Sequence, residues 1–324
     1  VYCERFKNGL EKMKYSILIP AFKIQYLREC LESLFNQTNQ DFEVIVLNDC
    51  SPDDIASVVA DFHDSRLRYY ENDQNIGVVD VVDNWNKLLS LALGEFVVCM
   101  GDDDKLAPNF LEQYDKLMVS YPGLDLYHAR TEIIDEHSDF LNLQEDRPSW
   151  QSAYQMLWNC IFEPTIQFIG DFLFRRTTLL SNGGFYKLPL AWGSDCLSAI
   201  IAAKEKGCAN THEPTLYYRS NRYSITQSSN IELKMVATKQ FADWVRNFVV
   251  DVPAEDVDAI YRRLLKQGLS SSIHHDMRLM MADDMRNHMT HLVRWVRTRY
   301  QYELSLSDIV FAAAIAVGLK LLRK

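Results

Sequence analysis

The 324-residue sequence has little positive charge and no pair of cysteines spaced as C-x-x-C. Its 34 lysines and arginines are outnumbered by 44 aspartates and glutamates, which gives a formal net charge of −10. A general nucleic-acid binder needs a basic face, so this balance argues against that class of protein. The seven cysteines are odd in number and scattered, which indicates reduced, mostly buried thiols of a cytosolic protein.

Long hydrophobic runs are also scarce. Residues Val1–Lys14 are charged and contain no apolar segment of the kind that signal peptides have, so we expect a cytoplasmic protein. The apolar stretch Ile309–Leu322 is interrupted by Lys320 and is too short to predict a membrane span. An apolar helix that ends in basic residues suits peripheral contact with the inner face of a membrane, and it equally suits a place in the core. Both alternatives stay open.

The glycine-rich loops that bind phosphates in many α/β proteins are missing. A dinucleotide-binding domain needs G-x-G-x-x-G after the first strand, and that position reads Pro20-Ala21-Phe22-Lys23. The P-loop pattern G-x-x-x-x-G-K-[ST] does not occur either. The phosphates of a ligand would therefore need another counter-charge, such as a divalent metal held by carboxylates.

Apolar, β-branched runs alternate with helical patterns through the first third of the chain. This alternation predicts an α/β fold with a mostly parallel central sheet, flanked by helices, in which ligands bind beyond the carboxyl ends of the strands. Residues 20–23, 48–51 and 101–104 fall at those ends, so we expect three strand ends to form one polar crevice. The strands are predicted at Tyr15–Pro20, Phe42–Leu47, Leu67–Glu71 and Phe96–Met100.

The most informative stretch is Gly94–Phe110, which reads GEFVVCMGDDDKLAPNF. An apolar strand ends there in three consecutive carboxylates, Asp102, Asp103 and Asp104. Carboxylate oxygens suit a hard divalent cation that carries a phosphate. Taken alone, three aspartates more often form a solvated turn, so the rest of the chain decides between the two interpretations.

Several ordered motifs from Tyr15 to about Thr226 resemble those of the inverting family 2 glycosyltransferases, which have the GT-A fold. SILIPAFK resembles the family's S-I-I-I-P-x-Y-N, and EVIVLNDCSPD resembles E-I-I-V-V-D-D-x-S-x-D. The segments NIG, NWNK and ALGEF resemble N-x-G, N-W-N-x and A-x-G-E-[FY]. GDDDKLAPNF resembles D-x-D-D-x-x-x-P-x-x-[FL], and GGF followed by WGSD resembles G-G-F and [EG]-x-D. The order of the motifs, rather than any one of them, carries the resemblance.

The resemblance implies a metal-dependent enzyme that moves a sugar from a nucleoside diphosphate donor, usually UDP-linked, to a hydroxyl of a glycan or lipid-linked glycan. It implies that Pro20 and Phe22 line the base of the donor and that Asp49 accepts a hydrogen bond from that base. Asp102 would lie near the ribose and the phosphates.

The resemblance also assigns the metal and the catalytic base. Asp103 would coordinate Mg²⁺ or Mn²⁺, Asp104 would assist directly or through water, and Asp195 would be the general base. From the residues alone, Ser194-Asp195 equally fits the N-cap of the apolar helix that follows. Trp192 either stacks on an acceptor sugar or packs in the core, and both alternatives stay open.

Two departures from the family pattern support a second hypothesis. Gly101 stands where the family has an aspartate, and Asn221 stands where a histidine is frequent. With these departures the chain could instead be a non-catalytic nucleotide-sugar-binding or scaffold subunit of a glycan-assembly complex. That hypothesis predicts nucleotide binding without turnover.

Three regions are predicted along the chain. Residues 15–105 would form the nucleotide-sugar-binding half of the GT-A domain, residues 106–229 its acceptor-binding and catalytic half, and residues 230–324 a C-terminal helical extension. The extension would contact a membrane surface or another subunit. Methionines recur there every four residues, which predicts a helix with an apolar stripe in the core or at an oligomer contact. These methionines are Met277, Met281, Met285 and Met289.

Overall fold

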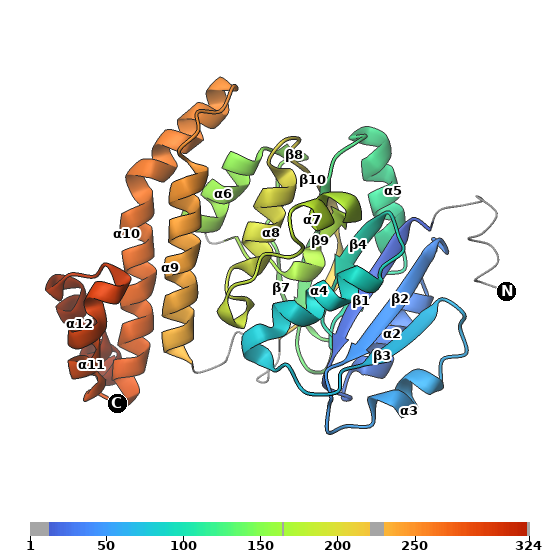
Figure 1. Ribbon diagram of the computed structural model, residues 1–324, viewed down its shortest axis with the longest axis horizontal. Helices are drawn as coiled ribbons and strands as arrows, with labels where there is room; N and C mark the ends of the chain where they lie inside the picture. The colour runs from blue at the N-terminus through green and yellow to red at the C-terminus, as the bar shows by residue number, and fades with distance from the viewer. Residues whose placement is uncertain (1–12, 164, 221–229, 323–324) are drawn as a thin grey trace.

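The computed structural model describes residues 13–163, 165–220 and 230–322. Within these ranges one ten-stranded sheet runs through the molecule, and helices cover both of its faces (Figure 1). The strand order is β3-β2-β1-β4-β9-β6-β10-β5, with β7 paired to β6 and β8 paired to β10. The strands are β1 (Tyr15–Ala21), β2 (Phe42–Asn48), β3 (Leu67–Glu71), β4 (Phe96–Cys99), β5 (Lys105–Leu106), β6 (Leu126–Ile134), β7 (Phe140–Leu143), β8 (Trp150–Gln151), β9 (Phe172–Arg175) and β10 (Cys208–Arg219).

Besides the α-helices, the chain has short 3-10 turns, labelled η, which lie before or after the longer elements. In chain order the α-helices are α2 (Leu27–Phe35), α3 (Ile55–Ala60), α4 (Val81–Leu91), α5 (Phe110–Ser120), α6 (Ala153–Phe162), α7 (Arg176–Ser181), α8 (Ser194–Ala203), α9 (Ile231–Phe248), α10 (Asp256–Asn287), α11 (His291–Thr298) and α12 (Leu306–Leu322). The 3-10 turns are η2 (Val78–Asp80), η3 (Ile169–Asp171), η4 (Pro189–Ala191) and η6 (Arg299–Tyr302).

The first half of the sheet is parallel. β1 pairs in parallel with β2 on one side and with β4 on the other, and β2 pairs in parallel with β3. The chain crosses between these strands through α2, α3 and α4. Every residue of β2 is buried, because elements packed on both faces of the sheet leave no face to solvent. The predicted α/β architecture is therefore confirmed for this part of the chain.

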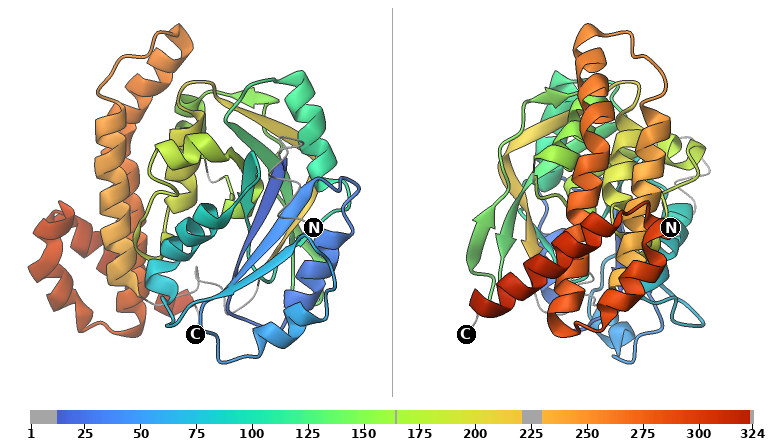
Figure 2. Two further views of the ribbon diagram at one scale, coloured as in Figure 1. Left: turned by 45° about the vertical axis from the view of Figure 1, so that its right-hand side comes forward. Right: turned by 90° about the vertical axis from the view of Figure 1, so that its left-hand side faces the viewer.

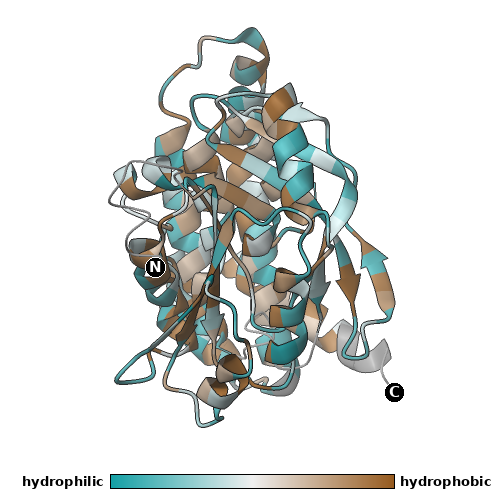
Figure 3. Ribbon diagram, turned by 90° about the vertical axis from the view of Figure 1, so that its right-hand side faces the viewer, coloured by the Kyte–Doolittle hydropathy of each residue, from teal (hydrophilic) through white to brown (hydrophobic). Residues whose placement is uncertain are grey.

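Alternate residues of β1 pack into two separate cores. Ile17 and Ile19 face the core that α2, α3 and α5 share, whereas Leu18 faces the core that α4, α6 and α8 share. Successive side chains of a strand point to opposite faces, so an unbroken apolar run can supply both cores. Figure 3 colours the ribbon by hydropathy and shows hydrophobic stretches along the interior strands.

Beyond β4 the sheet becomes mixed. β9 lies antiparallel between β4 and β6, and β10 runs parallel to β6. The short strand β5 pairs antiparallel with β10, where Leu106 is opposite Leu216. This pairing places the end of β10 beside the residues that immediately precede β5. Strands of one sheet therefore come from both predicted halves, up to Arg219 at the end of β10, and the division into two functional halves stays a prediction.

The C-terminal helices form a layer against α6 and α8. The right-hand view of Figure 2 shows α9 and α10 side by side, with α12 crossing α10. Met277, Met281 and Met285 of α10 are buried in the same core as α8. The core alternative is therefore confirmed for these three methionines, whereas Met289 lies beyond the end of α10 and is half-buried.

Helix α12 has one buried face and one exposed face. Ile309, Ala312 and Ala316 are buried, whereas Phe311 and Val317 are exposed. The side chains of its basic end, from Leu319 onward, lie outside the described part of the chain. No helix among the described residues combines the length and the apolar character that crossing a membrane requires.

Candidate functional site

The ends of β1, β2 and β4 meet at one edge of the sheet. Ala21 and Asn48 are paired at the ends of β1 and β2. The pairing continues into the loops, because Asp49 N donates to the Ala21 carbonyl oxygen (2.9 Å) and Met100 N donates to the Leu18 carbonyl oxygen (3.1 Å). The predicted convergence of three strand ends on one polar edge is therefore confirmed.

Residues Gly101–Asp104, which follow β4, form the acidic turn, and Asp102 ties this turn to the end of β1. Asp102 Oδ2 accepts hydrogen bonds from the backbone N–H groups of Phe22 (2.7 Å) and Lys23 (2.8 Å). Asp102 is 8% exposed. Its burial and the neighbouring charge of Asp103 raise the pKa of its carboxyl to about 6. The Asp102 carboxylate is thus held in place at the end of β1.

Asp104 is also buried and held by backbone donors. Its Oδ1 accepts from Arg219 N (2.9 Å), and its Oδ2 accepts from Gly101 N (3.2 Å). Burial and the charge of Asp103 hold the pKa of Asp104 well above its usual range. Asp103 is the most accessible of the three aspartates. A divalent cation beside Asp103 would relieve the repulsion between these crowded carboxylates.

The glycine at position 101 leaves room for this arrangement. A Cβ atom on Gly101 would lie 2.7 Å from Asp103 Oδ1 and 3.0 Å from Asp104 Oδ2, closer than side-chain atoms normally approach. An aspartate at this position would therefore displace one of the other two carboxylates. The glycine is part of how this chain places its aspartates, and it does not by itself indicate a disabled site.

A complete protein metal site is not assembled in the described part of the chain. No group of three or more histidine, cysteine, aspartate or glutamate side chains there is arranged to hold a metal ion. Asn221, where the family frequently has a histidine, lies outside the described residues. The assignment of Asp103 and Asp104 to a metal therefore stays a prediction.

A buried arginine that sequence reasoning missed holds the acidic turn. Arg219, at the end of β10, is 1% exposed. Its Nε donates to the carbonyl oxygen of Asp103 (2.9 Å), and its Nη2 donates to Glu29 Oε2 (2.7 Å). Its guanidinium group also lies 4.2 Å from the ring centroid of Tyr26. The Y-Y-R segment at residues 217–219 could have pointed to Arg219. The comparison with the family directed attention instead to position 221, where a histidine is frequent.

Replacing Arg219 with alanine is expected to lower the free energy of unfolding by about 3 kcal/mol. The substitution breaks the ion pair with Glu29 and removes the donors that the carbonyl oxygens of Asp103 and Asp135 accept. Urea unfolding measures the change. The matched control is Arg297→Ala, at an exposed position of α11, where we expect a change within about 0.5 kcal/mol. Equal effects in the two variants would contradict the role of Arg219.

Asp49 follows β2 and holds the loop of residues 72–77. A carboxylate can accept about four hydrogen bonds, and donors from this loop already fill the acceptor positions that a nucleotide base would need. Binding a base through Asp49 would require one of these donors to move, and the role of Asp49 toward the base stays a prediction. Its oxygens accept from Asn72 Nδ2 (2.8 Å), Asn75 Nδ2 (3.1 Å), Ile76 N (2.9 Å) and Gly77 N (3.1 Å).

Pro20 and Phe22 lie where β1 ends, beside these carboxylates. Pro20 is half-buried, whereas Phe22 is 42% exposed. The Phe22 N–H donates to Asp102, and its carbonyl oxygen accepts from Ser51 Oγ (2.5 Å). The backbone of Phe22 thus links the loops after β1, β2 and β4. An exposed aromatic ring at such an edge suits stacking on a planar base.

Asp195 lies in the first turn of α8 but does not cap that helix. The N-cap is Gly193, in the left-handed region with φ of 88°, and no side chain caps the helix there. The Ser194 hydroxyl instead accepts from Leu188 N (3.0 Å). The alternative in which Ser194-Asp195 caps the helix is therefore wrong. Asp195 is half-buried, and burial raises the pKa of its carboxyl to about 6.

Residues 167–170 join Asp195 to the acidic turn. The Gln167 side chain lies close to the Asp195 carboxylate, where it favours the ionised form and lowers the pKa. A few residues later, Gly170 lies against the end of β4, where a Cβ atom on it would lie 3.3 Å from Met100 Cβ. Met100 immediately precedes the acidic turn. Asp195 therefore lies near one end of residues 167–170, and the acidic turn lies near the other end.

The fold and this edge define a class, namely α/β proteins that bind a ligand at the carboxyl ends of parallel strands through clustered carboxylates. A family model described as Glycosyl transferase family 2 matches residues 16–182, which is more than half of the chain. The chain belongs to this family.

Solved structures confirm the predicted GT-A type of fold. Staphylococcus aureus TarS in complex with UDP-GlcNAc has a TM-score of 0.65 and 15% identity, over 95% of this chain and 92% of that one. The mannosyltransferase PcManGT from Pyrobaculum calidifontis, in complex with GDP-Man and Mn²⁺, has a TM-score of 0.54 and 14% identity, over 98% and 92%. At these identities the likeness shows the fold alone.

The relatives found by sequence match only part of this chain. EpsH of Bacillus subtilis is 30% identical over 147 residues, which are 43% of this chain and 41% of EpsH. The GalNAc(5)-diNAcBac-PP-undecaprenol beta-1,3-glucosyltransferase of Campylobacter jejuni is 41% identical over 96 residues, which are 29% of this chain and 30% of that protein. The matches thus span less than half the length of either relative.

Proposed function

We propose that the chain is a metal-dependent inverting glycosyltransferase that moves a sugar from a nucleoside diphosphate donor to a hydroxyl of a glycan or lipid-linked glycan. The observation that carries this proposal is Asp195, a half-buried carboxylate with a raised pKa that residues 167–170 join to the acidic turn. Membership of glycosyl transferase family 2 supports the reaction type.

The donor would lie along the ends of β1, β2 and β4. Pro20 and Phe22 would line its base, Asp49 would bond the base, and Asp102 would lie near the ribose and phosphates. Asp103 and Asp104 would hold Mg²⁺ or Mn²⁺, which neutralises charge on the departing diphosphate when bound. We favour a UDP-linked donor because TarS, a neighbour that covers nearly the whole chain, is described with UDP-GlcNAc.

Asp195 would act on the acceptor. Its carboxylate takes the proton of the acceptor hydroxyl as that oxygen bonds to the anomeric carbon of the donor sugar. The bond between the anomeric carbon and the phosphate oxygen breaks, and its electron pair leaves with the nucleoside diphosphate. A single displacement by this route inverts the configuration at the anomeric carbon.

The acceptor class rests on the relatives. The Campylobacter jejuni relative is named for an acceptor that carries an undecaprenol diphosphate, which favours a lipid-linked glycan here. The exposed side chains of Val310, Phe311 and Val317 on α12 are apolar, so this helix would contact the inner face of a membrane. Such a contact would bring the site to a lipid-linked acceptor.

The rate of sugar transfer is expected to fall as the pH drops below about 6. Burial raises the pKa of Asp195 to about 6, and only the ionised carboxylate can accept a proton. The initial rate at saturating donor should therefore be half-maximal near pH 6 and level above about pH 7.5. A rate that stays constant down to pH 4.5 would contradict the assignment of the base.

A panel of nucleotide sugars with Mn²⁺ tests the proposed function. Thermal shift identifies the donor that binds, and release of the nucleoside diphosphate measures its turnover. We expect one UDP-sugar to stabilise the chain and to be hydrolysed slowly in the absence of an acceptor. Binding without turnover across a broad acceptor panel would favour the non-catalytic alternative, and no binding at all would contradict both.

A further inference from the structure

A turn between α6 and β9 is anchored at both neighbours of Gln167. The Ile166 carbonyl oxygen accepts from Gln144 Nε2 (2.6 Å). The Phe168 N–H donates to Asp171 Oδ2 (2.7 Å). Because the backbone is held immediately before and after it, Gln167 starts from a fixed position, and the directions that its side chain can take are restricted.

The anchor of this turn is a buried polar cluster beside β6, made of Thr131, Gln144 and Asp171. Each of the three residues is at most 1% exposed. Thr131 Oγ1 donates to Asp171 Oδ1, and Gln144 Nε2 donates to Asp171 Oδ2 (2.9 Å). Gln144 also bonds the Thr131 backbone, because its N–H donates to the Thr131 carbonyl oxygen (2.9 Å) and its Oε1 accepts from Thr131 N (3.0 Å). Such a cluster is rigid, since breaking any of these bonds leaves a buried polar group unsatisfied.

The same turn brings two groups of opposite effect to Asp195. Burial raises the pKa of the Asp195 carboxyl to about 6, and the negative charge of Asp171 acts in the same direction. The Gln167 side chain lies close to this carboxylate and acts in the opposite direction. An amide N–H beside a carboxylate favours the charged form, because it can donate a hydrogen bond to it.

Two other titratable groups near Asp195 keep their charge around pH 6. The neighbouring thiol of Cys160, at the end of α6, and burial hold the pKa of the Cys196 thiol well above its usual range. Burial lowers the pKa of His128, which lies on β6 beside Asp171, to about 4. Neither Cys196 nor His128 therefore changes its charge between about pH 5 and pH 8.

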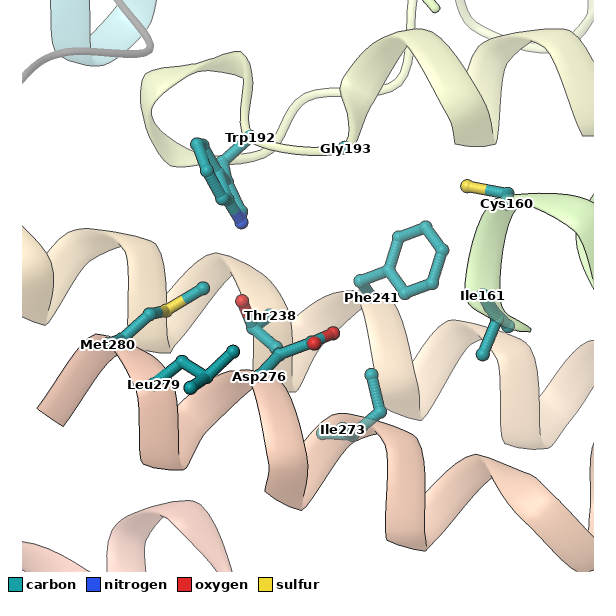
Figure 4. A pocket seen from close by; sticks show the side chains of 10 residues that line it. All are labelled: Cys160, Ile161, Trp192, Gly193, Thr238, Phe241, Ile273, Asp276, Leu279 and Met280. Carbon is teal, nitrogen blue, oxygen red and sulfur yellow. The ribbon is translucent and has the colours of Figure 1, made fainter. Parts of the chain in front are cut away.

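Further charged groups lie around the turn and around the loop that precedes α8. Figure 4 shows Asp276 of α10 at one pocket with Cys160 and Gly193, and burial raises the pKa of Asp276. Lys234 of α9 lies 4.7 Å from the ring centroid of Trp192. Arg147 approaches the turn itself, where its Nη2 donates to the Ile166 carbonyl oxygen (3.5 Å). These surroundings stay the same when Gln167 or Asp171 is replaced.

We propose that Gln167 is a positioning residue for the general base, held in place by the cluster of Thr131, Gln144 and Asp171. The Gln167 amide restricts the orientation of the Asp195 carboxylate and favours its charged form. The fixed charge of Asp171 opposes this effect and keeps the carboxylate a strong base. The inference rests on the proposed function, because it takes Asp195 as the base. Gln167 acts through Asp195 and needs no contact with the substrate.

The pH profile of sugar transfer in two variants tests the inference. Gln167→Met removes the amide and should raise the pH of half-maximal rate from about 6 to about 7. Asp171→Asn removes the charge and should lower this pH to about 5. The matched control Gln267→Met, at an exposed position of α10, should leave it at about 6. A merely structural role would lower the rate in both variants without moving their midpoints in opposite directions.

Urea unfolding gives the same readout without a donor. The pKa of Asp195 is raised in the folded chain, so its contribution to stability is present at low pH and is lost as the pH rises through about 6. The difference in the free energy of unfolding between the chain and its Asp195→Asn variant should therefore level off near pH 6. With Gln167→Met in both chains it should level off near about pH 7, and with Asp171→Asn near about pH 5.

Midpoints that stay at about 6 in both variants would overturn the inference, and so would two shifts of the same sign. If Asp171→Asn does not fold, Gln167→Met decides alone, because Gln167 is only half-buried. The two readouts separate the two proposals. If unfolding shows the expected shifts and the transfer rate does not follow them, Gln167 acts on Asp195 and the proposed function fails. If transfer is half-maximal near pH 6 and neither variant moves either readout, the inference alone fails.

Discussion

Replacing Asp195 with asparagine is expected to lower the rate of sugar transfer by about 1,000-fold, because the acceptor would lose the proposed general base. Donor binding should not change, since Asp195 lies at the far end of residues 167–170 from the acidic turn. The melting temperature should stay the same or rise, because burial disfavours the ionised form of this carboxylate.

Initial transfer rates and the dissociation constant of the nucleotide sugar, measured on the same preparation, test this expectation. Asp256→Asn, a change of the same kind at an exposed position of α10, should keep the full rate. An Asp195→Asn variant that transfers at the normal rate would contradict the assignment. A variant that loses both transfer and donor binding would place Asp195 at the donor edge instead.

Replacing Asp103 with alanine is expected to remove the part of donor affinity that depends on Mn²⁺, a loss of about 100-fold. Asp103 is the most accessible carboxylate of the acidic turn, and its charge raises the pKa of both Asp102 and Asp104. Removing it would therefore take away the proposed metal ligand and relieve the crowding of like charges. Calorimetric titration of the nucleotide sugar with Mn²⁺ and with a chelator measures the effect.

The control for Asp103 is Asp139→Ala, in the exposed turn between β6 and β7, which should leave the metal-dependent affinity unchanged. The two variants should differ only when Mn²⁺ is present. If Asp103→Ala loses the same affinity with the chelator as with Mn²⁺, then Asp103 contacts the donor directly and the metal assignment is wrong.

Local patterns predicted much of the fold and the meeting of three strand ends at one edge of the sheet. The unbroken apolar runs at β1, β2 and β4 require cover on both faces, and such strands occur in parallel sheets flanked by helices. Parallel strands end at one edge, so Asp49 and Asp102 could be placed near each other before any contact was known. The methionine spacing of α10 likewise predicted its buried face.

Contacts between distant parts of the chain could not be predicted in this way. Arg219 bonds the carbonyl oxygen of Asp103, which lies 116 residues earlier, and no local pattern records that pairing. The hydrogen bonds of Asp49 to the loop of residues 72–77 were also missed, because the motif suggested a ligand and gave no sign of the loop.

The anomeric configuration of the sugar released from an α-linked nucleotide sugar is the most direct test of the central claim. Water can replace the acceptor in slow donor hydrolysis, and NMR records the first product before its two anomers interconvert. A single displacement assisted by Asp195 predicts that the β-anomer forms first and that Asp195→Asn abolishes its formation. Initial release of the α-anomer would contradict an inverting transfer at this site.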